Sequence, residues 1–195
     1  PRGFDETWAA AMGGAGVTLA SLGVQTFAPH VQAAIGRTQS RAVIARAVEL
    51  LREAGVVSLN MDLMYGLPRQ ALHDLDTSID VAVDLGVDRL AVFGYAHVPH
   101  LIARQRRIDA TGLPDQRARF DMAARAHARL TAAGYVPIGF DHYARATDAL
   151  AAAAQAGRLR RNFQGYTDDR ADILIGIGAS AISEFAHLYV QNEHN

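Results

Sequence analysis

Short apolar runs alternate along the chain with longer stretches in which apolar residues recur at helical spacing. The short runs predict β-strands at 17–24, 56–64, 89–93, 135–140 and 173–177. Capping residues such as Asp5 and Ser40 precede the longer stretches and glycines close several of them, which is typical of helices. These helices are predicted at 5–11, 40–54, 74–85, 101–107, 114–134 and 147–156.

Strands that alternate with amphipathic helices favour βα units and a parallel sheet. Polar side chains fall near the carboxyl ends of the predicted strands, and they are Gln25, Asp62, Tyr65, Tyr95, His97, Asp141 and His142. Parallel barrels build their sites from the ends of many strands, whereas an open sheet gathers them at one switch point. We therefore expect an α/β fold, a partial (β/α) TIM-like barrel with parallel strands and outer helices, which occupies residues 1–195 as one incomplete domain.

The composition excludes several classes of function. The 195 residues carry 19 basic and 20 acidic side chains, so no basic face for nucleic acid is expected. The absence of cysteine excludes a disulfide framework and leaves an iron–sulfur cluster without thiolate ligands in these residues. No apolar run approaches the roughly 18 residues of a membrane span.

Three residues in the first half of the chain carry candidate binding chemistry. Gln25 ends a predicted strand, where its amide either binds a polar ligand or, as buried amides commonly do, ties down its own loop. Arg37 could clamp a carboxylate, but on sequence alone a surface arginine is the favoured interpretation. Asp62 lies inside an apolar strand, where an unpaired carboxylate is costly, so it is expected to be paired or functional.

Histidines and loop residues supply further candidates. His97 and His100 are three positions apart, but an intervening proline disfavours the helix that would align them, and no metal site is expected. His142 either hydrogen-bonds within its loop or acts as an acid. The Phe163-Gln164 segment indicates a loop, and loops often carry function.

Six segments form a recognisable succession along the chain. They are Gly23-Val24-Gln25-Thr26-Phe27, Asn60-Met61-Asp62-Leu63-Met64-Tyr65-Gly66-Leu67-Pro68, Tyr95-Ala96-His97-Val98-Pro99, Asp141-His142-Tyr143-Ala144-Arg145, Arg161-Asn162-Phe163-Gln164-Gly165-Tyr166-Thr167 and Gly178-Ala179-Ser180-Ala181-Ile182-Ser183. The succession resembles the oxygen-independent coproporphyrinogen III oxidases, which are radical S-adenosylmethionine (SAM) enzymes of haem biosynthesis. The segment from Arg161 to Thr167 is the most specific of the six.

The resemblance implies an activity and its cofactors. Enzymes of this family oxidatively decarboxylate two propionates of coproporphyrinogen III to vinyl groups, which gives protoporphyrinogen IX. They use a 4Fe–4S cluster and two SAM molecules, and cleavage of SAM yields the 5′-deoxyadenosyl radical that abstracts a propionate hydrogen. The resemblance thus implies a cytoplasmic, monomeric oxidoreductase, served by a reductant protein and without nucleic-acid or membrane partners.

The resemblance also implies roles for single residues. Five of them would bind SAM: Gln25, Arg37 and Asp62 at one molecule, Ala96 and Ile182 at the other. Two would border the cofactor and substrate cavity, and these are Phe163 and Gln164. The candidates for the substrate propionates are His97, His142, Arg145 and Arg161. No residue is assigned as catalytic and none as a metal ligand.

Parts of the family pattern are expected outside this chain. Its CxxxCxxC cluster motif would precede Pro1 and its C-terminal helical domain would follow Asn195, so the chain by itself is expected to be inactive. Two alternatives stay open. One is a haem or tetrapyrrole carrier on the same fold without turnover. The other is a barrel hydrolase or aldolase that uses Asp62 and His142 as acid and base.

Overall fold

The computed structural model describes residues 3–163 and 165–193. The chain divides into two compact units, Pro1–Asp148 and Ala149–Asn195. None of the described helices is long and apolar enough to cross a membrane.

A five-stranded sheet forms the centre of the first unit, in the order β1-β2-β3-β5-β4. Its strands are β1 (Leu19–Gln25), β2 (Ser58–Tyr65), β3 (Arg89–Gly94), β4 (Tyr135–Pro137) and β5 (His142–Arg145). The first three strands are parallel, and β5 is antiparallel to both of its neighbours, so β4 runs in the same direction as β1 to β3. The predicted parallel βα pattern is confirmed for β1 to β3, while β5 makes the sheet mixed.

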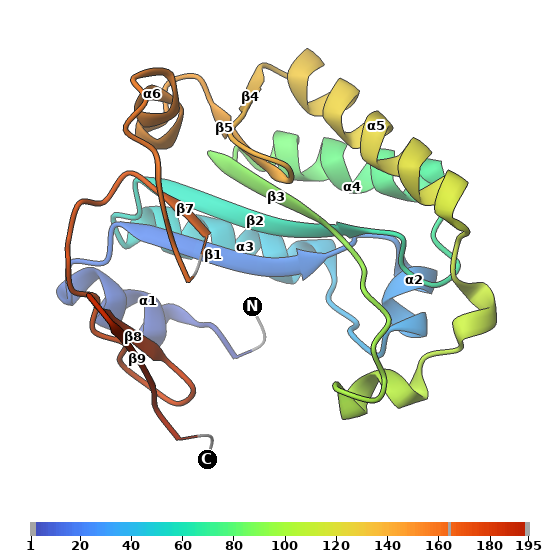
Figure 1. Cartoon of the computed structure of the whole chain (residues 1–195), viewed down its shortest axis with the longest axis horizontal. Coiled ribbons are helices and arrows are strands. Elements are labelled where there is room, and N and C mark those ends of the chain that lie inside the picture. The colour runs from blue at the N-terminus through green and yellow to red at the C-terminus, as the bar shows by residue number, and fades with distance from the viewer. Residues whose placement is uncertain (1–2, 164, 194–195) are drawn as a thin grey trace. The chain divides into compact units, whose positions relative to one another are not determined.

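Helices connect these strands, and α3 and α4 lie on one face of the sheet (Figure 1). The helices of the unit are α1 (Glu6–Gly14), α2 (Pro29–Ala34), α3 (Arg41–Glu53), α4 (Leu72–Asp84), α5 (Gln116–Ala132) and two short 3₁₀ helices, η1 (Ala103–Arg107) and η2 (Ala110–Gly112). Ser40 begins α3 by accepting a hydrogen bond from the backbone N–H of Val43, as its predicted capping role requires.

The hydrophobic core lies between the sheet and these helices. Alternate residues of the strands point into it, among them Leu22, Val24, Leu59, Met61, Leu63, Leu90 and Val92. The helices contribute buried residues from their apolar faces, among them Ile44, Leu51, Leu75, Ile79 and Leu130. Because side chains alternate along a strand, the residues between these core positions point to the opposite face of the sheet.

The opposite face of the sheet is polar toward the carboxyl ends of its strands. One row of residues crosses four strands in register: Gly23 pairs with Asp62, Asp62 with Ala91, and Ala91 with His142. Ser21 pairs with Asn60, and both lie on this face two residues before Gly23 and Asp62. The sheet is therefore apolar where helices cover it and polar where the candidate residues lie.

In its described residues, 149–163 and 165–193, the second unit consists of one helix and two hairpins. The helix α6 spans Ala149–Gln155, and the hairpins pair β6 (Arg160–Asn162) with β7 (Gly165–Thr167) and β8 (Ile182–Phe185) with β9 (Leu188–Gln191). The predicted strand at 173–177 is wrong. Its isoleucines alternate as in a strand, but the segment makes one isolated bridge, between Leu174 and Glu184, and its isoleucines are exposed.

Candidate functional site

Three polar side chains surround Gly23, near the end of β1. A Cβ atom at Gly23 would lie 3.1 Å from Gln25 Nε2, 3.2 Å from Arg37 Nη2 and 4.0 Å from Asp62 Oδ2. Arg37 also donates from Nη2 to the carbonyl oxygen of Gly23 at 2.6 Å. We call Gly23, Gln25, Arg37 and Asp62 the Gly23 cradle, because the missing side chain lets the three polar groups meet.

The cradle holds polar atoms without partners. Among the residues that the structure describes, Gln25 Oε1 and Arg37 Nε are buried and accept or donate no hydrogen bond. Such atoms are costly to bury and are rare in folded proteins, so we treat the cradle as a candidate ligand site. Gln25 also adopts a φ of 73°, in the left-handed region, next to a register shift between β1 and β2. Backbone strain of this kind clusters at ligand sites.

The Asp62 carboxylate is held by its neighbours on the same face of the sheet. Asn60 Nδ2 donates to Asp62 Oδ1 at 2.7 Å and also to Ser21 Oγ at 2.8 Å. Burial raises the pKa of Asp62, while Asn60, His142, Ser21 and Arg37 act in the opposite direction. The arrangement aims a partly buried carboxylate at the cradle, where it can accept hydrogen bonds.

The loop that follows β3 is fixed by a buried glutamine. Gln105 Oε1 accepts a hydrogen bond from the N–H of Val98 at 2.6 Å, and Gln105 Nε2 donates to the carbonyl oxygen of Ala96 at 2.9 Å. His97 Nδ1 lies 3.0 Å from the hydroxyl of Tyr95. In the described part of the chain no group of three His, Cys, Asp or Glu side chains could hold a metal ion.

The two candidates on β5 lie at opposite ends of the sheet. His142 belongs to the same row as Asp62, and its Nδ1 lies 2.6 Å from Asp141 Oδ1. Arg145 lies at the amino-terminal edge of the parallel strands, because β5 is antiparallel to β3. Its Nε donates to the carbonyl oxygen of Val87 at 2.9 Å, and its guanidinium stacks 5.1 Å from the centre of the Tyr135 ring. The structure therefore does not bring Arg145 to the cradle.

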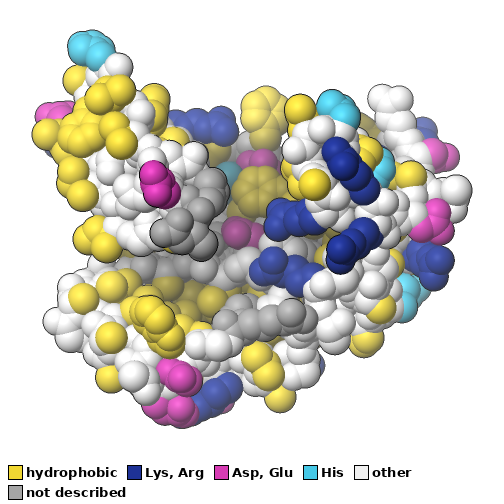
Figure 2. Space-filling view, turned by 90° about the horizontal axis from the view of Figure 1, so that it is seen from below, with side chains coloured by type: hydrophobic (Ala, Val, Ile, Leu, Met, Phe, Trp, Pro, Cys, Tyr) yellow, Lys and Arg dark blue, Asp and Glu magenta, His cyan; other side chains and the backbone are white. Residues whose placement is uncertain are grey.

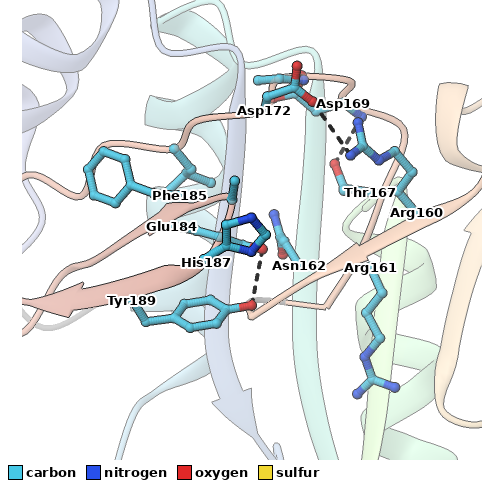
Figure 3. A pocket seen from close by; sticks show the side chains of 13 residues that line it. Arg160, Arg161, Asn162, Thr167, Asp169, Asp172, Glu184, Phe185, His187 and Tyr189 are labelled. Atoms are coloured by element: carbon cyan, nitrogen blue, oxygen red, sulfur yellow. Dashed lines mark hydrogen bonds and ion pairs between the residues drawn. The ribbon is translucent and has the colours of Figure 1, made fainter.

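The second unit encloses a cavity of about 470 Å³ between its hairpins (Figure 3). Arg160 and Asp172 form an ion pair at 3.9 Å on one side of it, and the hydroxyl of Tyr189 donates to Glu184 at 3.2 Å on the other. Arg161 also lines this cavity, but in Figure 3 its side chain points away from the Arg160–Asp172 pair. The cavity walls thus carry charges of both signs.

The remaining candidates of the second unit lie on its hairpins. The Phe163 ring meets the Tyr189 ring edge-on at 6.5 Å. Ile182 is the first residue of β8, and a Cβ on Gly176 would lie 2.7 Å from the Ile182 backbone. The glycine-rich segment thus approaches the chain's own backbone. Gln164 lies outside the described residues.

Sequence reasoning from single residues missed three residues that support the site. It favoured a surface position for Arg37, whereas the structure half-buries this side chain against Gly23. It also passed over Asn60 and Ser21, although strand alternation places both on the face of Asp62. The structure brings Gln25 and Asp62, both singled out from the sequence, together beside Gly23.

Comparison with known proteins gives consistent findings. Residues 1–82 match the family model of the Radical SAM superfamily. The chain is 48% identical over 98% of its length to the oxygen-independent coproporphyrinogen III oxidase of Paracoccus denitrificans, and covers 43% of that protein. The chain is also 42% identical over 89% of its length to the oxygen-independent coproporphyrinogen III oxidase of Escherichia coli, and it covers 38% of that protein.

A solved structure gives the same result. The Escherichia coli coproporphyrinogen III oxidase HemN, described as a radical SAM enzyme, superposes on the whole chain with a TM-score of 0.90 at 39% identity. The chain covers 45% of that structure. The chain therefore spans less than half the length of each of these three relatives.

Proposed function

The chain is a relative of the oxygen-independent coproporphyrinogen III oxidases of the radical SAM superfamily, and we propose that the complete protein oxidatively decarboxylates two propionates of coproporphyrinogen III to vinyl groups. The product would be protoporphyrinogen IX. The observation that supports this most strongly is the Gly23 cradle, where three side chains that the resemblance assigns to SAM meet and two of them carry an unpaired polar atom.

The cradle fits the polar groups of SAM. Asp62 offers a carboxylate that can accept hydrogen bonds from ribose hydroxyls, and Arg37 Nε is an unpaired donor that suits the amino-acid carboxylate. Gln25 Oε1 is an unpaired acceptor that suits the ammonium group. In this assignment the chain's own residues bind SAM and fix its orientation by charge-assisted hydrogen bonds from β1, β2 and the loop between α2 and α3.

Radical SAM proteins use SAM together with a 4Fe–4S cluster. When bound, SAM would supply the radical chemistry that removes a propionate hydrogen. Since the chain contains no cysteine, its residues do not fit the cluster, and we place the ligands elsewhere in the complete protein. A reductant protein would then serve the cluster, and the chain alone would not turn over.

The finer assignments follow the same resemblance. We propose that the sheet is part of a TIM-like barrel and that the protein is a cytoplasmic monomer. The loop at Ala96 would contact a second SAM, and in the second unit Ile182, Phe163 and Gln164 would keep their cofactor and cavity roles. The propionate candidates that stay in the proposal are His97, His142 and Arg161.

Anaerobic turnover tests the proposal. The complete protein, with its cluster reconstituted, is incubated with coproporphyrinogen III, SAM and a reductant, and the products are separated by chromatography. The proposal predicts protoporphyrinogen IX and a requirement for SAM. Binding of the tetrapyrrole without any vinyl product would contradict it and would favour a carrier on the same fold.

A further inference from the structure

Three exposed arginines follow the loop at Ala96, on the short helix η1. They are Arg104, Arg106 and Arg107, and within the described residues none has an acidic partner within 4 Å. The nearest acidic residue in sequence, Asp109, is paired instead with Arg69 at 3.6 Å. Neighbouring like charges repel one another, so three arginines without acidic partners on one short helix are unfavourable for folding.

The geometry of η1 separates the three arginines. Side chains three positions apart in a 3₁₀ helix eclipse each other, so Arg104 and Arg107 lie on the same side of η1. Arg106 turns elsewhere, because its Nε donates to the carbonyl oxygen of Pro99 at 3.2 Å. Gln105 anchors the helix from within, since it is buried and clamps the loop at Ala96.

The hydrogen bonds of Gln105 to Val98 and Ala96 hold η1 against the loop that follows β3. Burial raises the pKa of Tyr95, at the start of this loop, and the charge of Arg104 acts in the opposite direction. Tyr95 in turn hydrogen-bonds His97 Nδ1, which leaves His97 Nε2 for another partner. In Figure 1 the segment from Tyr95 to η2 extends beyond the carboxyl ends of β1 to β3. In Figure 2 arginine side chains gather in the half of the view where this segment lies.

We propose that Arg104 and Arg107, with His97, form a receptor for ligand carboxylates at the carboxyl end of the sheet. Guanidinium groups bind carboxylates through paired, charge-assisted hydrogen bonds, and two of them side by side suit a ligand with several carboxylates. The inference rests on the proposed function, which supplies a substrate with propionate side chains. The preferred occupant is therefore a propionate of the tetrapyrrole.

A carboxylate could also come from SAM, whose amino-acid end carries one. Two ligands separate the sources: coproporphyrin III, the stable oxidised form of the substrate, followed by fluorescence, and radiolabelled SAM, followed by equilibrium dialysis. Both are titrated against the complete protein and the variants Arg104→Gln and Arg107→Gln. Arg106→Gln is the control within η1, and Arg117→Gln, an 83% exposed arginine on α5, is the control elsewhere.

Each variant at Arg104 or Arg107 is expected to weaken coproporphyrin III binding about tenfold or more, with SAM binding unchanged. Both control variants should stay within about twofold of the native protein. A loss of SAM binding alone would assign the receptor to the SAM carboxylate and overturn the propionate assignment. If the native protein binds both ligands and no variant alters either, this inference fails while the proposed function stands. If the native protein binds neither ligand, the proposed function fails first.

Discussion

The Gly23 cradle leads to a sharp prediction for the substitution Gly23→Ala. The added methyl would lie 3.1 Å from Gln25 Nε2 and 3.2 Å from Arg37 Nη2, closer than ordinary van der Waals contact. Both atoms belong to side-chain ends, so they can move by a few tenths of an ångström. The same movement turns them away from the position in which they would meet a ligand.

The size of each effect follows from this geometry. Folding stability should change by no more than about 1 kcal/mol, since only side-chain ends must shift and alanine is preferred to glycine within a strand. SAM affinity should fall more, because displacing Arg37 weakens at least one charge-assisted hydrogen bond worth about 1.5–3 kcal/mol. That range corresponds to a loss of about tenfold to a hundredfold.

The assay pairs equilibrium dialysis of radiolabelled SAM with thermal unfolding of the complete protein. Gly14→Ala is the matched control, because a Cβ at Gly14 would meet no atom within 4 Å. Gly23→Ala should lose SAM affinity with a nearly unchanged melting temperature, and Gly14→Ala should match the native protein in affinity. If Gly23→Ala binds SAM within twofold of the native protein, the cradle is not the SAM site.

Three further predictions concern charged residues of the first unit. Burial raises the pKa of Asp62, so the ionised carboxylate opposes folding, and it lowers the folding stability more as the pH rises above the ordinary carboxyl range. Asp62→Asn should therefore melt at a higher temperature than the native protein at pH 7. An equal or lower melting temperature would refute this. Arg145 is tied to Tyr135 at the far edge of the sheet, so Arg145→Leu should lower unfolding free energy by about 1–2 kcal/mol in denaturant titration and leave coproporphyrin III affinity unchanged. A fall in that affinity would instead restore Arg145 as a substrate contact. Asp148 pairs with Arg89 in a largely buried position, so Asp148→Ala should cost about 3 kcal/mol in the same titration, and a loss below about 1 kcal/mol would contradict the role of this pair.

The sequence pattern predicted the parallel part of the fold because its signals are local. The strands β1 to β3 are apolar runs with helices between them, and caps such as Ser40 begin helices where expected. The strand β5 carries no such signal. It is short, and polar residues stand at both of its ends, so its position between β3 and β4 depends on tertiary pairing.

The candidate site divides in the same way. Gln25 and Asp62 were found because a polar residue in or beside an apolar strand calls for an explanation. The residue pattern alone did not indicate that Arg37 is half-buried, because its burial depends on a contact with Gly23, which lies 14 positions away in sequence. His142 was expected near a strand end, and the pairing of β5 with β3 puts it in the row of Asp62. The sequence could not place Arg145, because the direction of β5 decides at which edge of the sheet Arg145 lies.

The transfer of hydrogen from substrate to SAM tests the central claim most directly. Coproporphyrinogen III deuterated in its propionate side chains is incubated anaerobically with SAM, a reductant and the complete, cluster-loaded protein, and the adenosine-derived product is analysed by mass spectrometry. The account predicts deuterium in 5′-deoxyadenosine together with vinyl product. Recovery of intact substrate with no label in 5′-deoxyadenosine would contradict it.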